Sequence, residues 1–328
     1  MTQIGHYIAA SRRHGVLGVH SLDHFALAVP DLEDARRYYA SFGLEVREHG
    51  NALHLHTHGH PHRWGVLTEA TRKALSHLSF GIFADDAERF RAHLEQCGIA
   101  RLDPPPGLES NGFWFRDPDG SLIELKVAEK SSPNAKSVAG IDSAPANRRG
   151  APIRGHAALV QPRRLAHVLL FARDVPGTLD FYTPVLGLRL SDEAGGVIAF
   201  LHGVHGSDHH MVAFAKSGGP GMHHCSWDVA SVNDIGVGAA QMADKGFIAG
   251  WGLGRHVLGS NYFHYVRDPW GSYAEYSCDI DYCPADADWE GGSHGVENSL
   301  YLWGPEPPAD FTFNYEASSE AQLVARRH

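Results

Sequence analysis

Hydrophobic and polar positions follow one pattern that occurs in both halves of the chain. The segment that begins at Ser21 reads SLDHFALAVPDLEDARRYYASFGLEV. The segment that begins at Arg164, RLAHVLLFARDVPGTLDFYTPVLGLRL, has the same order of residue types. Each predicts a hydrophobic strand, a Pro/Asp break, an amphipathic helix and a Gly turn into another strand.

A second repeated motif predicts a β-hairpin in each half. The two copies are NGFWFRDPDGSLIELKV, from Asn111, and NYFHYVRDPWGSYAEYS, from Asn261. In both, an Arg-Asp-Pro-x-Gly turn joins two strands, and a Glu lies in the second strand. Internal repetition of this kind defines an architecture. We therefore predict an α+β fold of four βαβββ modules, paired into two domains, with the modules at residues 19–68, 75–127, 163–215 and 221–280.

The segments between and after the paired modules lack apolar periodicity. We predict an N-terminal domain (1–130), a linker (131–162) rich in Ser, Pro, Ala, Gly and Arg, a C-terminal domain (163–280) and a tail (281–328) packed on that domain. The tail carries aromatic residues and prolines. From the sequence, it could cover an active site or form a subunit contact.

Composition narrows the class of protein. Hydrophobic residues make up 43% and charged residues 20% of the 328 positions, which is typical of globular proteins. A net charge of −10 argues against nucleic-acid or anionic-membrane partners. No apolar stretch approaches the roughly 20 residues of a membrane span, and the start lacks a secretory signal. With four cysteines and no CxxC pair, we expect a cytoplasmic protein without disulfides.

The repeated modules with their RDPxG-x-x-x-E turns resemble the vicinal oxygen chelate superfamily. From His167 to Tyr276 the chain resembles type I extradiol ring-cleavage dioxygenases of the catechol 2,3-dioxygenase type. The resemblance implies an Fe(II) enzyme, with Mn(II) possible, that acts in aromatic-compound degradation. Such an enzyme inserts both atoms of O₂ into a catechol next to its hydroxyls and forms a muconic semialdehyde. The resemblance also implies a homo-oligomer.

Three metal ligands are expected on three predicted strands of the C-terminal half. They are His167, His224 and Glu275. Two imidazoles and one carboxylate on one face of an ion leave the opposite positions open for substrate and O₂. Side chains alternate along a strand, so we expect His223 and His224 to point to opposite faces and only one to be a ligand. The resemblance assigns His224.

The resemblance also implies three catalytic residues around the metal. His210 is the expected acid–base group, because an imidazole titrates near neutral pH, and His209 is the fallback assignment. Tyr265 is expected to hydrogen-bond the bound substrate. His256 is expected to contact substrate or O₂. Arg255 could meet a substrate carboxylate or pair with an acid in the fold.

The N-terminal half keeps the residue types of the metal triad. The repeat places His24, His77 and Glu124 opposite His167, His224 and Glu275. Arg63 matches His210, and Trp114 matches Tyr265, so the expected acid–base residues are missing. We therefore predict that this domain is not catalytic, and the resemblance implies that it is metal-free, as the N-terminal domain of such dioxygenases usually is.

An alternating histidine run precedes Arg63. It consists of His54, His56, His58, His60 and His62. Gly59 and Pro61 interrupt any fixed ligand geometry, and we predict a solvated strand edge and hairpin rather than a metal site.

Other functions remain open from the sequence. A 4-hydroxyphenylpyruvate dioxygenase would use the same iron triad on a keto acid, and a glyoxalase-like enzyme would use another metal in the same fold. A metal-free small-molecule binding protein is the alternative from another class. The sequence also does not decide between Fe and Mn or among substituted catechols.

Overall fold

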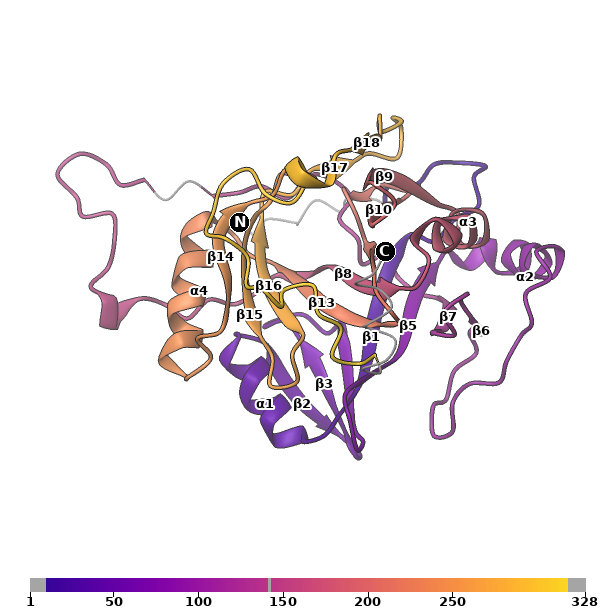
Figure 1. Ribbon diagram of the computed structural model, residues 1–328, viewed down its shortest axis with the longest axis horizontal. Coiled ribbons are helices and arrows are strands. Elements are labelled where there is room, and N and C mark those ends of the chain that lie inside the picture. Colours follow the sequence, from indigo (N-terminus) through magenta and orange to yellow (C-terminus); the bar gives the residue numbers. More distant parts are fainter. Residues whose placement is uncertain (1–9, 141–142, 318–328) are drawn as a thin grey trace, which may run out of the picture.

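The computed structural model describes residues 10–140 and 143–317. In this part of the chain two large mixed β-sheets lie against each other, with helices at their outer sides (Figure 1). The predicted α+β fold of paired modules is confirmed. Among the described residues, no helix has both the length and the apolar character needed to cross a bilayer.

The N-terminal sheet has seven described strands in the order β2-β3-β4-β1-β5-β7-β6. An antiparallel β1–β5 contact joins its two modules. In chain order its elements are β1 (Ser21–Val29), α1 (Leu32–Ser41), β2 (Glu45–His49), β3 (Ala52–His56), β4 (Gly65–Glu69), β5 (Ala74–Ile82), η1 (Ala84–Asp86), α2 (Ala87–Gln96), β6 (Phe113–Arg116) and β7 (Leu122–Val127).

The C-terminal sheet has nine described strands in the order β14-β15-β16-β13-β8-β12-β10-β9-β18. Its modules meet at the antiparallel β8–β13 contact. After the short helix η2 (Arg154–His156), the elements of this half are β8 (Arg164–Ala172), α3 (Val175–Leu186), β9 (Leu188–Ala194), β10 (Ile198–Gly203), β11 (Ser207–Asp208), β12 (Val212–Lys216), β13 (Gly221–Asp228), α4 (Val232–Asp244), β14 (Gly250–Arg255), β15 (Tyr262–Arg267), β16 (Tyr273–Cys278), β17 (Tyr282–Cys283), β18 (Gly292–His294) and η3 (Val296–Asn298).

The second module differs from the predicted βαβββ order. Its first strand after the helix is reduced to a single bridge between Leu102 and Trp114. The three prolines that follow, Pro104 to Pro106, have no N–H group to donate to a ladder, so a strand cannot continue there. The second module is therefore βαββ among the described residues.

The histidine run forms the predicted hairpin, because β3 and β4 pair antiparallel around an exposed turn, but the prediction of a strand edge is wrong. Strand β3, which carries His54 and His56, pairs with β2 on one side and β4 on the other. Strand β2, which forms a hairpin with β3, is the edge strand instead. The side chain of His56 is buried. His58 and His60 lie in an exposed turn after the strand.

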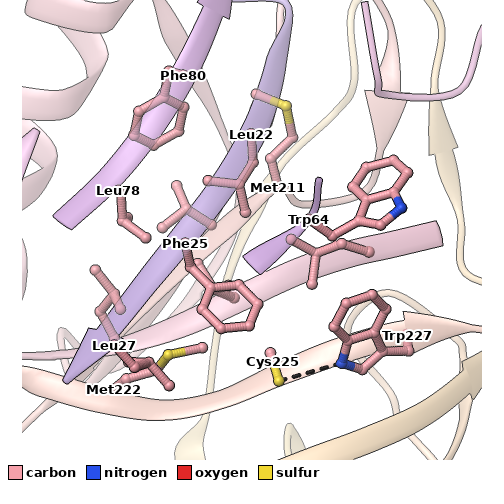
Figure 2. Close-up of a cluster of buried hydrophobic side chains, with 14 of the residues drawn as sticks. Leu22, Phe25, Leu27, Trp64, Leu78, Phe80, Met211, Met222, Cys225 and Trp227 are labelled. Atoms are coloured by element: carbon pink, nitrogen blue, oxygen red, sulfur yellow. Dashed lines mark hydrogen bonds between the residues drawn. The ribbon is translucent and has the colours of Figure 1, made fainter. Parts of the chain in front are cut away.

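The two sheets share one hydrophobic core. Figure 2 shows Phe25 of β1 and Leu78 of β5 facing Cys225 and Trp227 of β13. Because side chains alternate along β1, Phe25 enters this core while its neighbour His24 lies near His77 of β5. The strands that carry candidate ligands in the two halves therefore pack against each other through this core.

The described part of the tail, residues 281–317, runs over the C-terminal sheet. Strand β17 pairs with β11, and β18 pairs with β9 and forms the edge of the C-terminal sheet. Further along, Arg255 and Trp303 form a bridge. The carboxylate of Glu316 then forms a buried ion pair with Lys73 of the N-terminal domain, at 2.8 Å. The last part of the predicted tail, 318–328, lies outside the described residues.

Candidate active site

Three neighbouring strands bring the predicted metal ligands together. His167 on β8, His224 on β13 and Glu275 on β16 each offer a ligand atom within 4.8 Å of the others. The Glu275 Oε2 atom lies 3.3 Å from His167 Nε2 and 3.6 Å from His224 Nε2. In the sheet, Ser226 pairs with both His167 and Glu275, so their side chains emerge side by side on one face.

Three buried atoms of this cluster lack a hydrogen-bond partner among the described residues: Glu275 Oε2, His224 Nε2 and His167 Nδ1. The first two face each other at 3.6 Å. Burying a carboxylate oxygen or an imidazole nitrogen without a partner is costly, and each is satisfied if it binds a cation. Two imidazole nitrogens and one carboxylate oxygen suit Fe(II) or Mn(II). The residues present therefore fit a divalent metal ion.

His223 does not point away from His224, and the expectation of opposite faces is wrong. The β8–β13 register shifts between Met222 and His224, so His223 is the extra residue of a β-bulge. The bulge brings His223 Nδ1 to 2.7 Å from His224 Nδ1, and His223 Nε2 to 2.7 Å from the carbonyl of Phe311 in the tail.

These two contacts determine which nitrogen of His224 is free. Burial lowers the pKa of His223 to about 4, so the ring is neutral and carries one proton. That proton lies on Nε2, which donates to the Phe311 carbonyl. Its Nδ1 therefore accepts from His224 Nδ1–H, and the lone pair of His224 Nε2 faces Glu275.

His210 lies beside the first ligand. Its ring centroid is 4.0 Å from that of His167, and its Nδ1 is 3.0 Å from His209 Nδ1. His209 Nε2 donates to Asp192 Oδ2 at 2.8 Å. In the neutral state, His209 thus accepts from His210 Nδ1–H, which leaves the lone pair of His210 Nε2 free. Burial, and next the neighbouring His167, lower the pKa of His210 well below its ordinary value.

Tyr265 and His256 form the other side of the site. His256 Nδ1 donates to the Leu300 carbonyl at 2.6 Å, so its Nε2 accepts from the Tyr265 hydroxyl at 2.9 Å. Burial, and next the Glu275 carboxylate, raise the pKa of Tyr265 well above its ordinary value, and the phenol stays protonated. Asn261 donates to Glu275 Oε1 at 3.2 Å and orients the carboxylate.

A cavity of about 270 Å³ opens beside the triad. His210, His256 and Tyr265 line it together with apolar side chains of the sheet, such as Leu169 and Phe200. The tail forms one wall through Val296, Ser299, Leu300, Phe311 and Thr312. The described part of the tail therefore covers one side of this cavity.

Arg255 does not line the cavity. Its guanidinium lies 4.7 Å from the ring centroid of Tyr262, and its Nε donates to the Ser260 carbonyl. Lys216, which the sequence analysis did not consider, lies in the cavity wall and is exposed. It is a cation at the cavity wall.

Sequence reasoning missed the residues that orient the predicted ones. His223 orients His224, Asn261 orients Glu275, and the carbonyls of Leu300 and Phe311 orient two histidines. The doubled histidines at 223–224 and 209–210 were the visible signal. The bulge and the path of the tail are not visible in the sequence.

The N-terminal counterpart of the triad is also assembled. His24 on β1, His77 on β5 and Glu124 on β7 offer ligand atoms within 4.8 Å of one another. Arg63 lies beside His24, and Trp114 pairs with Glu124 as Tyr265 pairs with Glu275.

Comparison with known proteins places these observations in a family. The profile described as Glyoxalase/Bleomycin resistance protein/Dioxygenase superfamily matches residues 21–125 and 164–276. The chain is 49% identical over 309 residues to Metapyrocatechase 2 of Cupriavidus necator, a match that covers 94% of this chain and 95% of the relative. It is 25% identical to the Manganese-dependent 2,3-dihydroxybiphenyl 1,2-dioxygenase of Geobacillus genomosp. 3, over 86% and 93% of the two chains.

A solved structure shows the same fold. A mutant of Homoprotocatechuate 2,3-Dioxygenase from Brevibacterium fuscum aligns with a TM-score of 0.73 at 19% identity. The alignment covers 96% of this chain and 86% of that one.

Proposed function

The chain belongs to the Glyoxalase/Bleomycin resistance protein/Dioxygenase superfamily, and on this premise we propose that it is an extradiol dioxygenase of aromatic degradation. It cleaves a catechol-type ring with O₂ beside the two hydroxyls and gives a muconic semialdehyde. One observation carries the proposal: the two-histidine, one-carboxylate cluster opens into a cavity that also holds His210 and Tyr265.

His167, His224 and Glu275 would hold the metal ion. When bound, the ion supplies a Lewis acid that gathers the catechol oxygens and O₂ and lets electron density pass between them. His224 is held in place by the hydrogen bond that it donates to His223, and Glu275 by the one that it accepts from Asn261.

His210 moves the protons of the reaction. Its free Nε2 accepts a proton from a substrate hydroxyl and later returns it to a product oxygen. The imidazolium formed in between is stabilised by His209 and, behind it, by Asp192. Although burial raises the pKa of Asp192, hydrogen bonds from His209 and His294 hold it below the ordinary value, so this group stays a carboxylate.

Tyr265 and His256 position the substrate. The phenol donates to His256 Nε2, and Tyr265 pairs with Glu275 between β15 and β16, so a catechol oxygen that enters the cavity meets a fixed hydroxyl. The tail and the apolar walls exclude water. The apolar walls favour a catechol with apolar substituents, and Lys216 is the cation that a carboxylated substituent would meet at the wall.

We propose Fe(II) as the metal, with Mn(II) as the alternative. Both ions accept this ligand set, and one relative is named as manganese-dependent. A cytoplasmic location and a homo-oligomeric assembly remain predictions, which cell fractionation and gel filtration would test.

The test is anaerobic reconstitution of metal-free protein with Fe(II) or Mn(II), followed by oxygen-uptake assays. Catechol, alkylcatechols, chlorocatechols, a carboxylated catechol and 4-hydroxyphenylpyruvate are the substrates. We expect oxygen uptake and a yellow ring-fission product with catechols, best with apolar substituents. Oxygen uptake with the keto acid alone would make the protein a hydroxyphenylpyruvate dioxygenase. Metal-loaded protein that consumes no oxygen with any catechol would refute ring cleavage.

A further inference from the structure

The N-terminal domain contains a second cluster of metal-ligand residue types that ring cleavage does not use. We propose that His24, His77 and Glu124 bind a divalent transition-metal ion of their own, in a site that is not catalytic. From the sequence, the resemblance implies a metal-free domain, and the missing acid–base residues imply that it is not catalytic. Metal binding, however, requires only the ligands.

The backbone places the two clusters in the same register. Ser79 pairs with His24 on β1 and with Glu124 on β7. Ser226 pairs in the same way with His167 and Glu275. The N-terminal ligands therefore emerge from equivalent positions on one face of a rigid sheet.

The two imidazoles have the spacing of a chelating pair. His24 Nδ1 donates to Asp23 Oδ2 at 2.7 Å, so the lone pair of His24 Nε2 points to the cluster. His24 Nε2 lies 3.3 Å from His77 Nε2. Two nitrogens that are each about 2.1 Å from a shared ion lie roughly 3 to 3.4 Å apart.

Glu124 is oriented for the same purpose. One of its oxygens accepts from Ser79 and the other from Ser110. Each carboxylate oxygen has two acceptor positions, so these bonds fix the group and leave a lone pair for an ion. All three ligands are buried, and a carboxylate buried beside two neutral imidazoles gains from a cation.

A polar cavity of about 380 Å³ gives the cluster access to water. Ser110 and Asn111 line it beside the three ligands. An ion can therefore enter from solvent and complete its coordination with water molecules.

Arg63 explains why this site is not catalytic and why it is weaker than the C-terminal one. Its Nη2 lies 3.4 Å from His24 Nε2, whereas in the other half His210 is the neighbour of His167. The guanidinium repels a cation and cannot accept a proton. Because Arg63 is only partly buried, its side chain can turn toward solvent when an ion binds.

The test counts Zn²⁺ ions bound to metal-free, full-length protein by isothermal titration and by elemental analysis after gel filtration. We expect two ions per chain in the wild type and one in either Glu124→Gln or Glu275→Gln. We expect none in the double variant. The glutamine oxygen can accept from one of Ser79 and Ser110, and its NH2 group can donate to the hydroxyl of the other. Thermal unfolding without metal checks the fold of each variant.

Two further variants separate this site from other sources of binding. His60→Ala, in the exposed histidine turn, is the control and leaves two ions bound. Asp23→Asn in the Glu275→Gln background lowers the affinity about 10- to 100-fold. In the same background, Arg63→Ala raises the affinity of the N-terminal site for Zn²⁺, because the repelling guanidinium is gone.

The proposal fails if the wild type binds one ion and Glu275→Gln none. It also fails if the second ion is lost in His60→Ala and kept in Glu124→Gln. Neither result bears on ring cleavage, because the C-terminal ion is counted separately by its loss in Glu275→Gln.

Discussion

Histidines act in pairs at the active site. In each pair, the neighbouring histidine determines which ring nitrogen of the functional histidine carries the proton. His223 leaves Nε2 of His224 free for a metal, and His209 leaves Nε2 of His210 free for a proton. Each outer histidine is in turn held by an acceptor, the Phe311 carbonyl or the Asp192 carboxylate. The chemistry of each functional imidazole therefore depends on its neighbouring histidine and on the acceptor that this neighbour contacts.

At the residue scale, His210→Gln separates proton transfer from metal binding. The metal ligands stay in place, so the C-terminal ion should remain bound, whereas kcat should fall about 10²- to 10⁴-fold because the acid–base group is gone. Elemental analysis and oxygen uptake measure the two quantities. His60→Gln, on the exposed turn, is the control. Unchanged turnover in His210→Gln would remove His210 from the mechanism.

Tyr265→Phe tests the positioning hydroxyl. The aromatic ring keeps its stacking against Trp251, so the unfolding temperature should change little. Loss of one hydrogen bond to His256 should lower kcat/KM up to about tenfold, the value of a single hydrogen bond. Steady-state oxygen uptake measures it. If kcat/KM stays at the wild-type value, the phenol has no positioning role.

At the scale of elements, the sheet carries the candidate ligands, while the bulge in β13 and the tail orient them and enclose the cavity. The tail supplies the Leu300 and Phe311 carbonyls and one wall of the cavity, although it belongs to neither module of the C-terminal pair. Its far end is held by Glu316, which accepts from Lys73 Nζ and from the backbone of Leu75 and Met222.

Breaking the Lys73–Glu316 pair should destabilise the protein. Lys73→Met leaves a buried carboxylate without its cation, which costs about 3 to 5 kcal/mol, whereas Lys73→Met with Glu316→Leu costs less because no charge remains. Urea unfolding at neutral pH measures the difference. If the double variant were less stable than Lys73→Met, the buried charge would not be the cause.

The same pair gives a pH dependence with a definite sign. Although burial raises the pKa of Glu316, the charge and hydrogen bond of Lys73 outweigh it and hold the pKa below the ordinary value. A carboxylate with a depressed folded-state pKa stabilises the protein above its unfolded pKa, about 4.3, and this contribution is lost as the pH falls. The stability gap between wild type and the double variant should therefore shrink in acid.

At the scale of the whole molecule, the two domains form one folding unit. The Phe42 ring of the N-terminal domain stacks on Tyr276 of the C-terminal one with ring centroids 3.8 Å apart, and Tyr38 donates to the Val266 carbonyl at 2.6 Å. The shared core of Figure 2 lies between the strands that carry the two ligand clusters.

Phe42→Ala should therefore weaken both domains together. Removing this fully buried ring costs about 3 to 5 kcal/mol, and we expect a single unfolding transition at a lower temperature. Far-ultraviolet circular dichroism and tryptophan fluorescence, followed in the same thermal scan, should coincide. Two separate transitions would show that the domains fold independently.

The sequence by itself determined the module order and the strands that carry His167, His224 and Glu275. Strand alternation, helix periodicity and the RDPxG turns are local signals, and each of them occurs in both halves of the chain. Pro104 to Pro106 also carried the local reason for the missing strand of the second module.

Only the tertiary structure decided how the ligands are oriented and what covers them. The bulge at His223 depends on how β13 pairs with β8, and its partner Phe311 is 88 residues away in the chain. The burial of His56 depends on β2 folding outside β3. Contacts of this kind join residues far apart in sequence, so no local pattern of side chains encodes them.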